Sequence, residues 1–354
     1  MTDASSVRLG IVGCGNIGRH HAERLGDEGA TLVGAVDVDP DAREAFAERF
    51  DVDTYEDHAP LYDAVDAVVV ATPNKFHERY AVDALDAGLD VLVEKPLAHT
   101  VESAERIADA AAGADGFCMV GFHTRFENAV EVLTGYRDAG RLGEVGHVEA
   151  TLVRRRGVPG RGSWFTREAV AGGGALVDIG VHATDLALYL LGYPDVTEVS
   201  GVTRSQFGGR EDYTYLDMWG EDHGHEAFDV DDSASAFVRC ADGRTISLEV
   251  AWAANRPSAQ EYVLRGTEGG ATYDQREGTL TIHETSNAGA AHMSDTTVGA
   301  SDNDAHADEG AYFLEHVASG TAPDRNTVDQ ALTVQRVLDA VYRSSERGEA
   351  VRLD

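Results

Sequence analysis

The sequence predicts an α/β protein of two domains: a doubly wound parallel sheet, then an α/β domain with a large, mainly antiparallel open sheet. Up to about residue 120, short strands rich in Val and Ala alternate with helical segments and show no polar alternation. That pattern is typical of a parallel sheet covered on both faces. Beyond Gly192, successive strands joined by short turns indicate antiparallel pairing. We therefore expect domains at residues 1–122 and 123–354.

The elements of the first domain follow from hydrophobic periodicity. The expected strands are Val7–Val12, Thr31–Val36, Ala67–Ala71, Asp90–Val93 and Phe117–Val120. The expected helices are Ile17–Leu25, Asp41–Phe50, His77–Ala87 and Val101–Ala112.

The second domain is expected to begin with a helix around Asn128–Arg137, followed by a strand that ends at residues 154–156. A glycine-rich loop, Gly157–Gly174, then leads to a helix over Ala175–Gly192. Later strands are expected at Val196–Phe207, Ala234–Arg239, Thr245–Ala253, Glu261–Arg265 and Thr279–Glu284, with turns at residues 242–243 and 268–270. The last two helices are expected at Glu309–Val317 and Val328–Arg347.

The first strand runs into the turn Gly13-Cys14-Gly15-Asn16-Ile17-Gly18, which opens a helix. In this context the first glycine permits the tight turn, the second lets the backbone approach a pyrophosphate, and the third allows close helix–strand packing. Free N–H groups at the helix start face the phosphates. Asp37 closes the second strand, where a carboxylate accepts hydrogen bonds from ribose hydroxyls and repels a 2′-phosphate. The pattern predicts a dinucleotide-binding domain that prefers NAD, with NADP as the alternative.

Two further loops are expected in the same crevice, because ligands bind beyond the carboxyl ends of the strands in such sheets. One holds Thr72, Pro73 and Asn74 and leads to His77; the other holds Glu94, Lys95 and Pro96. Lys95 is one of only two lysines in the chain and ends an apolar run. Burying a cation there costs free energy, so its presence suggests a function. The alternative is a structural Glu94/Lys95 ion pair. His77 is expected to begin a helix or line the cofactor wall.

The helix expected over Ala175–Gly192 carries few ionisable groups. Apart from Tyr189 they are Asp178, His182 and Asp185, at i, i+4 and i+7 on one face. So sparse a face is not expected to be solvated in so acidic a chain. The functional interpretation is that His182 works as a general acid/base oriented by Asp178. The alternative is a buried histidine satisfied by a neighbouring carboxylate.

Composition constrains the partners and the habitat. The chain has 62 Asp and Glu against 29 Lys and Arg, a formal net charge of −33. A field of that sign repels nucleic acid and anionic membranes, and molar salt screens the self-repulsion it creates. Carboxylate excess with lysine depletion is similar to cytoplasmic proteins of extreme halophiles.

Other features agree with a cytoplasmic protein. No apolar run reaches the length of a membrane span, and residues 1–4 lack the basic region of a signal peptide. Three distant cysteines fit no disulfide framework or zinc spacing. His223, His225 and the nearby aspartates, like the acidic tract 302–309, show no ligand spacing, so no metal is expected.

Taken together, these motifs resemble the glucose–fructose oxidoreductase/inositol dehydrogenase/rhizopine-catabolism (Gfo/Idh/MocA) family. The resemblance rests on Gly13–Gly18, residues 71–74 with His77, Glu94-Lys95-Pro96, Gly121-Phe122 with Arg125, and Gly172–Asp185. It implies a Rossmann domain, a nicotinamide cofactor, and an open sheet used in a homodimer or homotetramer. Lys95, Asp178 and His182 fall on the family's catalytic positions, and its substrates are usually sugars or cyclitols.

The expected reaction is therefore reversible oxidation of a secondary or anomeric hydroxyl. His182 removes the hydroxyl proton, Lys95 donates a hydrogen bond to the same oxygen, and Asp178 orients His182. Arg125, Arg156, Trp164 and Asn255 are weaker candidates for the substrate wall. Three alternatives stay open: a redox-neutral enzyme that eliminates a glycoside, a sensor that binds dinucleotide without catalysis, and a purely structural protein.

Overall fold

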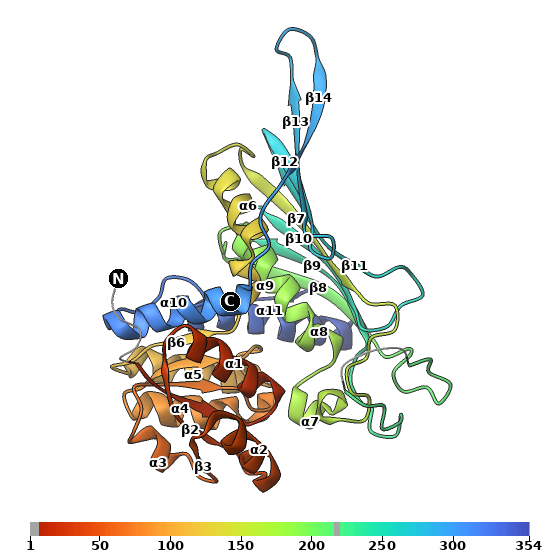
Figure 1. Cartoon of the computed structure of the whole chain (residues 1–354). Coiled ribbons are helices and arrows are strands. Elements are labelled where there is room, and N and C mark those ends of the chain that lie inside the picture. Colours follow the sequence, from red (N-terminus) through yellow and green to blue (C-terminus); the bar gives the residue numbers. More distant parts are fainter. Residues whose placement is uncertain (1–6, 216–219, 354) are drawn as a thin grey trace. The chain divides into compact units, whose positions relative to one another are not determined.

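The computed structural model describes residues 7–215 and 220–353 (Figure 1). The opening residues considered above for a signal peptide lie outside this range. The chain forms two units: residues 1–123 with 304–335, and residues 124–303 with 336–354. No helix of the described residues combines the length and apolarity that a membrane span requires.

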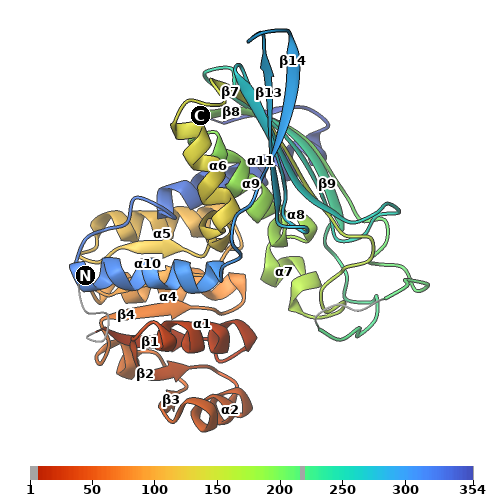
Figure 2. The ribbon, with the colours of Figure 1, turned by 45° about the horizontal axis from the view of Figure 1, so that its top comes forward.

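The first unit holds a parallel sheet of six strands in the order β3-β2-β1-β4-β5-β6 (Figure 2). Its strands are β1 (Arg8–Val12), β2 (Thr31–Val36), β3 (Asp53–Tyr55), β4 (Ala67–Val70), β5 (Asp90–Val93) and β6 (Cys118–Val120). Its helices are α1 (Asn16–Asp27), α2 (Pro40–Phe50), α3 (Ala59–Tyr62), η2 (Asn74–Phe76), α4 (His77–Asp86), α5 (Val101–Gly113) and α10 (Ala305–Ser319). The strand order reverses between β1 and β4, so a crevice is expected where their loops diverge.

The first segment of the first unit ends at residue 123, within one residue of the predicted boundary, but the second domain is not continuous over 123–354, because residues 304–335 return to the first unit. Helix α10 packs on α1: a side chain at Gly310 would meet Leu25, and Arg24 pairs with Asp304 at 2.8 Å. Phe313 lies edge-on against Phe117. The apolar residues that α10 contacts lie far earlier in the chain, Leu25 285 positions before Gly310 and Phe117 196 before Phe313, which spacing along the chain does not reveal.

The second unit holds a sheet of nine strands in the order β14-β13-β12-β11-β7-β10-β9-β8-β15 (Figure 1). Only β7 and β10 pair in parallel, so the predicted mainly antiparallel sheet is confirmed. Its strands are β7 (Val145–Val153), β8 (Val196–Arg204), β9 (Ser233–Cys240), β10 (Thr245–Ala251), β11 (Ala259–Gly266), β12 (Gly269–Asp274), β13 (Thr279–Ser286), β14 (His292–Val298) and β15 (Val351–Arg352). The helices are η3 (His123–Phe126), α6 (Asn128–Asp138), η4 (Trp164–Thr166), α7 (Glu168–Ala171), α8 (Ala175–Asp178), α9 (Gly180–Leu190) and α11 (Val328–Arg347), the last one shared with the first unit.

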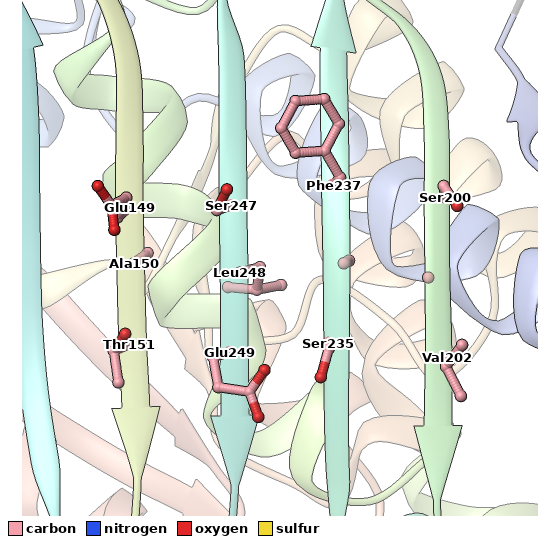
Figure 3. Close-up of a pocket in the computed structure, with 12 residues that line it drawn as sticks. Glu149, Ala150, Thr151, Ser200, Val202, Ser235, Phe237, Ser247, Leu248 and Glu249 are labelled. Atoms are coloured by element: carbon pink, nitrogen blue, oxygen red, sulfur yellow. The ribbon is translucent and has the colours of Figure 1, made fainter.

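The two faces of this sheet differ. Helices α8 and α9 pack on β7, β9 and β10, and Val341 of α11 approaches Gly201 of β8. The opposite face is a shallow depression over β7, β10, β9 and β8, shown in Figure 3. Side chains that line it are mostly small and polar, with Phe237 and Val202 among them.

Candidate functional site

The glycine-rich turn has the geometry that dinucleotide binding requires. Gly13 has φ of +107°, and a Cβ there would lie 2.6 Å from the carbonyl oxygen of Ala71. A Cβ on Gly18 would overlap the carbonyl of Gly13, so only glycine lets α1 approach β1 so closely. Gly15, by contrast, faces open space, and Asn16 and Ile17 beside it are exposed. The turn therefore leaves backbone N–H groups accessible to a pyrophosphate.

Asp37 follows β2 and lies beside this turn. One carboxylate oxygen accepts a 2.8 Å bond from the amide of Cys14, and the other a 2.9 Å bond from the amide of Asp39. Arg43 donates to the backbone carbonyl of Asp37 at 2.7 Å, so that guanidinium is tied to the loop. The carboxylate is thus fixed at the end of β2, where the sequence predicted a ribose contact.

Two loops carry the remaining predicted cofactor residues. Thr72, Pro73 and Asn74 follow β4, and His77 begins α4, as predicted. The His77 ring is fully buried between two carbonyls, with Nε2 at 2.8 Å from Thr72 O and Nδ1 at 3.0 Å from Pro96 O. Burial lowers the pKa of His77, and the two carbonyls beside the ring oppose that shift. His77 therefore ties the β4 loop to the loop that carries Lys95.

Glu94 has a partner that the sequence analysis did not find. Its Oε1 lies 2.6 Å from Nε2 of the buried His21, and its Oε2 accepts a 3.1 Å bond from the amide of Lys95. Burial alone would raise the pKa of Glu94, but the hydrogen bond and charge of His21 outweigh it and lower that pKa to about 2. Lys95 itself is half-buried at the end of β5.

In the second unit, three consecutive glycines position helix α8. A Cβ on Gly173 would overlap the Tyr342 hydroxyl, and one on Gly174 would overlap the backbone carbonyl of Asp231. The Asp231 carboxylate accepts bonds from the amides of Gly174 and Leu176 at 2.8 and 2.9 Å, and from the Tyr342 hydroxyl at 2.6 Å. These contacts fix the start of the helix that ends at Asp178.

The predicted helix over Ala175–Gly192 is divided at Ile179, whose φ and ψ of −109° and −28° join α8 to α9. In α8 and α9 every residue is buried except Asp178, His182 and Tyr189. The Asp178 carboxylate accepts a 2.8 Å bond from the indole N–H of the buried Trp252, which directly follows β10. Two of the three predicted catalytic residues are thus, with Tyr189, the residues of this helix pair that are not buried.

Two predicted residues have another role. Asp185 does not share the accessible face; it is fully buried and pairs with Arg125, whose Nε and Nη2 donate at 3.0 and 2.5 Å. The Tyr193 hydroxyl adds a 2.6 Å bond to the same carboxylate. Arg125 is itself fully buried, so the substrate-wall role expected of it gives way to that of a structural ion pair between η3 and α9.

The other candidates for the substrate wall are Arg156, Asn255 and Trp164. Arg156 donates to the side-chain oxygen of Asn255 at 2.7 Å, and its guanidinium lies 4.6 Å from the centre of the Phe207 ring. Trp164 stacks on Phe165 at 3.7 Å between ring centres. Arg156 and Asn255 are therefore brought together, as two side chains of one polar pair.

The carboxylates near His223 and His225 serve the backbone. Asp232 accepts from the amides of Phe207 and Gly208, as Asp231 does at α8. Among the residues that the structure describes, no group of three or more His, Cys, Asp or Glu side chains could hold a metal ion. Asp304 in the acidic tract caps α10 through the amide of Ala307.

The parallel sheet and the glycine turn are those of a dinucleotide-binding Rossmann domain. Residues 7–122 match the family model described as "Oxidoreductase family, NAD-binding Rossmann fold", and residues 133–272 match the Gfo/Idh/MocA C-terminal domain. The chain belongs to the Gfo/Idh/MocA family.

Named relatives agree with this assignment. An Amycolatopsis mediterranei protein, named as the oxidoreductase subunit of a UDP-kanosamine synthase, is 38% identical over 71% of this chain and 70% of its own length. D-Glucoside 3-dehydrogenase of Escherichia coli is 29% identical over 99% of this chain and 98% of that protein.

Solved structures share the whole fold. Levoglucosan dehydrogenase in complex with NADH superposes with a TM-score of 0.85 at 23% identity, over 98% of this chain and 99% of the other. GenD2 from gentamicin A biosynthesis, in complex with NAD, gives 0.78 at 28% identity, over 98% and 96%.

Proposed function

We propose that this protein is an NAD-dependent dehydrogenase that oxidises a secondary hydroxyl of a sugar, at C3 of a glucose-type ring. Asp178 and His182 carry the proposal, because they are left accessible on helices whose other polar side chains are buried or aromatic. The position on the ring is supported by two relatives: the E. coli D-glucoside 3-dehydrogenase, and the Bacillus subtilis glucose-6-phosphate 3-dehydrogenase, 30% identical over 54% of this chain.

Each proposed catalytic residue has a distinct role in the reaction. His182 takes the hydroxyl proton as the C–O bond becomes a carbonyl, and Asp178 orients His182. Lys95 donates a hydrogen bond to the same oxygen and stabilises the negative charge that develops there. The bound dinucleotide supplies the hydride acceptor. Arg156 and Trp164 offer donors and an aromatic face to a polyhydroxyl substrate.

Gly13, Gly15, Gly18 and Asp37 fit the dinucleotide, because the turn is open at Gly15 and the carboxylate is held at the end of β2. Asn16, Ile17, Thr72, Pro73, Asn74, His77 and Glu94 are the further residues that we propose to border the cofactor.

The test is NADH formation in molar KCl at mildly alkaline pH, with glucosides, sugar phosphates, free aldoses and inositols as substrates. We expect turnover of a glucoside and a loss of about 10²–10⁴-fold in His182→Ala. Lys95→Ala should lose turnover while NAD binding persists. NAD binding without turnover of any substrate would favour the sensor. Cleavage of a glycoside without net NADH would favour the redox-neutral enzyme.

Asp37 should decide the choice of cofactor. In Asp37→Ser the carboxylate that repels a 2′-phosphate is gone, so the ratio of kcat/KM for NADP to that for NAD should rise by about tenfold or more, equivalent to roughly 1.4 kcal/mol. Asp39→Ser, which leaves Asp37 in place, is the matched control. An unchanged ratio in Asp37→Ser would remove Asp37 from the proposed cofactor site.

We also propose that copies of the chain associate through the open sheet face shown in Figure 3. Val202 is 48% exposed on this face, and no helix of the described residues covers it. Light scattering should give a dimer or tetramer of the 37.8 kDa chain, and Val202→Arg should shift it toward the monomer. A monomer in the unmodified protein would contradict this.

The charge of the chain supports a cytoplasmic setting rich in salt, as in a halophile. With a net charge of −33, activity and stability should both require screening. Loss of activity on dialysis to low salt, recovered when KCl is restored, is the expected result.

A further inference from the structure

We infer that His21 is a positioning residue for Lys95, acting through Glu94. His21 lies on the inner face of α1, one turn after Gly18, and is 2% exposed. Its Nε2 is 2.6 Å from Glu94 Oε1, while Glu94 Oε2 accepts the amide of Lys95 at 3.1 Å. One carboxylate thus links the helix of the glycine turn to the backbone of the lysine.

The rest of the surroundings leaves Glu94 little freedom. Its amide donates to Val70 O at 2.9 Å, which fixes the backbone to β4. A Cβ built at Gly121 would be in ordinary contact with the carboxylate, at 3.4 Å from Oε2. Because both carboxylate oxygens already have donors, the Glu94 side chain is held in one orientation.

His77 holds the other side of the same loop through the carbonyl of Pro96, at 3.0 Å from Nδ1. The backbone on both sides of the Lys95 side chain is therefore held by a buried histidine. The Lys95 amide is linked to His21 of α1 through Glu94, and the Pro96 carbonyl contacts His77 of α4 directly. A loop anchored on both sides of a residue presents its side chain in a narrow range of positions, and misplacement by about 1 Å can reduce a rate by roughly 10²-fold.

His20, the neighbour of His21, provides the matched control. Its contacts are different: its Nδ1 lies 2.8 Å from the Arg24 guanidinium, and its ring packs edge-on against His306. The two histidines thus share a helix and a residue type but differ in their contact with Glu94.

The inference rests on the proposed function, and its test has a readout that does not. Lys75 and Lys95 are the only lysines in the chain, and Lys75 is exposed on η2. Competitive acetylation followed by peptide mass spectrometry therefore gives the reactivity of Lys95 relative to Lys75 within one molecule.

His21→Leu removes the donor, and His21→Gln retains one. We expect His21→Leu to change the Lys95/Lys75 labelling ratio and to lower kcat by about 10–100-fold, with the KM for NAD unchanged. His21→Gln should restore most of both, and His20→Gln should match the unmodified protein. If His21→Leu does not fold, His21→Asn, too short to reach Glu94, takes its place with the same expectations.

An unchanged labelling ratio in a folded His21→Leu or His21→Asn protein would overturn the inference, as would an equal effect of His20→Gln. If the unmodified protein oxidises no sugar, the proposed function fails, and the labelling ratio alone then decides whether His21 positions Lys95.

Discussion

Asp178 accepts a 2.8 Å hydrogen bond from the indole of Trp252, a side chain with no exposed surface. A hydrogen bond to a charged group contributes about 1.5–3 kcal/mol, and this one also fixes which way the carboxylate faces. In the proposed reaction Asp178 orients His182. The indole should therefore affect the rate indirectly, by fixing Asp178 of α8, which in turn orients His182 of α9.

Trp252→Phe tests this, because an aromatic ring remains in the core while the N–H donor is lost together with the five-membered part of the indole. We expect kcat to fall by about tenfold, the equivalent of roughly 1.4 kcal/mol, with little change in the KM for NAD. Tyr262→Phe, which removes one hydroxyl from a residue that is also fully buried in this sheet, is the control. A Trp252→Phe enzyme with the kcat of the unmodified protein would show that the indole does not position Asp178.

At the scale of elements, the junction of η3 with α9 depends on a buried charge pair. Arg125 and Asp185 have no exposed surface, and the guanidinium also lies against the rings of Tyr189 and Tyr193 at 4.9 and 5.0 Å. Burial opposes the charge of Arg125, but Asp185 outweighs it and raises the pKa of the guanidinium. The pair is therefore ionised in the folded protein.

Arg125→Met should destabilise the fold by about 3–5 kcal/mol, because it leaves the Asp185 carboxylate buried without its counter-charge. Replacing both residues, as in Arg125→Met with Asp185→Leu, should recover much of that loss. Urea unfolding in molar KCl measures both variants, and Arg8→Met, in an exposed pair with Asp66, is the control. Equal destabilisation by the single and double variants would mean that packing, not charge, matters here.

Periodicity was sufficient for the elements with a clear core face. Strands β2 and β5 and helix α11 have the predicted bounds, and the glycine turn lies between β1 and α1. Among the strands that escaped prediction, β12 begins at Gly269, which indicates a turn, and β14 is mostly exposed, so it has no apolar face to detect.

In the candidate site, too, local pattern predicted some residues and missed others. Lys95, Asp178 and His182 were found from local pattern, whereas their supports lie far along the chain: Trp252 is 74 residues from Asp178, and His21 is 73 from Glu94. Asp185 continues the helical spacing of Asp178 and His182, yet it is buried. Spacing predicts which face of a helix a residue lies on, but it does not predict which part of the protein packs against that face.

At the scale of the whole molecule, half-buried titratable groups with lowered pKa values predict how the fold responds to acid. Burial lowers the pKa of His306 from 6.5 to about 4, where its ring stacks on His123 at 3.7 Å. The unfolded chain therefore binds a proton that the folded chain resists, so the free energy of unfolding should decrease as the pH falls from 6.5 toward 4. Glu94 has a lowered pKa of about 2 against 4.5, so its contribution is lost at lower pH, between about 4.5 and 2.

His306→Gln should separate the loss of stability between pH 6.5 and 4 from the loss between about pH 4.5 and 2. Denaturant unfolding in molar KCl should give a shallower decrease between pH 6.5 and 4 in this variant, because the glutamine side chain does not titrate. The decrease below pH 4.5 should persist. If His306→Gln follows the unmodified protein at every pH, the half-buried ring of His306 is not a determinant of acid stability.

The net charge of −33 acts on the molecule as a whole, since carboxylates are spread along the entire chain. Their mutual repulsion destabilises the compact state, and salt weakens it as the Debye length falls from about 10 Å at 0.1 M to about 3 Å at 1 M. The Tm should therefore rise steeply with KCl up to roughly 1 M and more slowly beyond it. Sucrose at matched osmolarity separates screening from exclusion of solute from the surface, because sucrose strengthens burial without screening charge. A Tm that sucrose raises as much as KCl, or one that KCl leaves unchanged, would show that charge repulsion does not limit the stability of this fold.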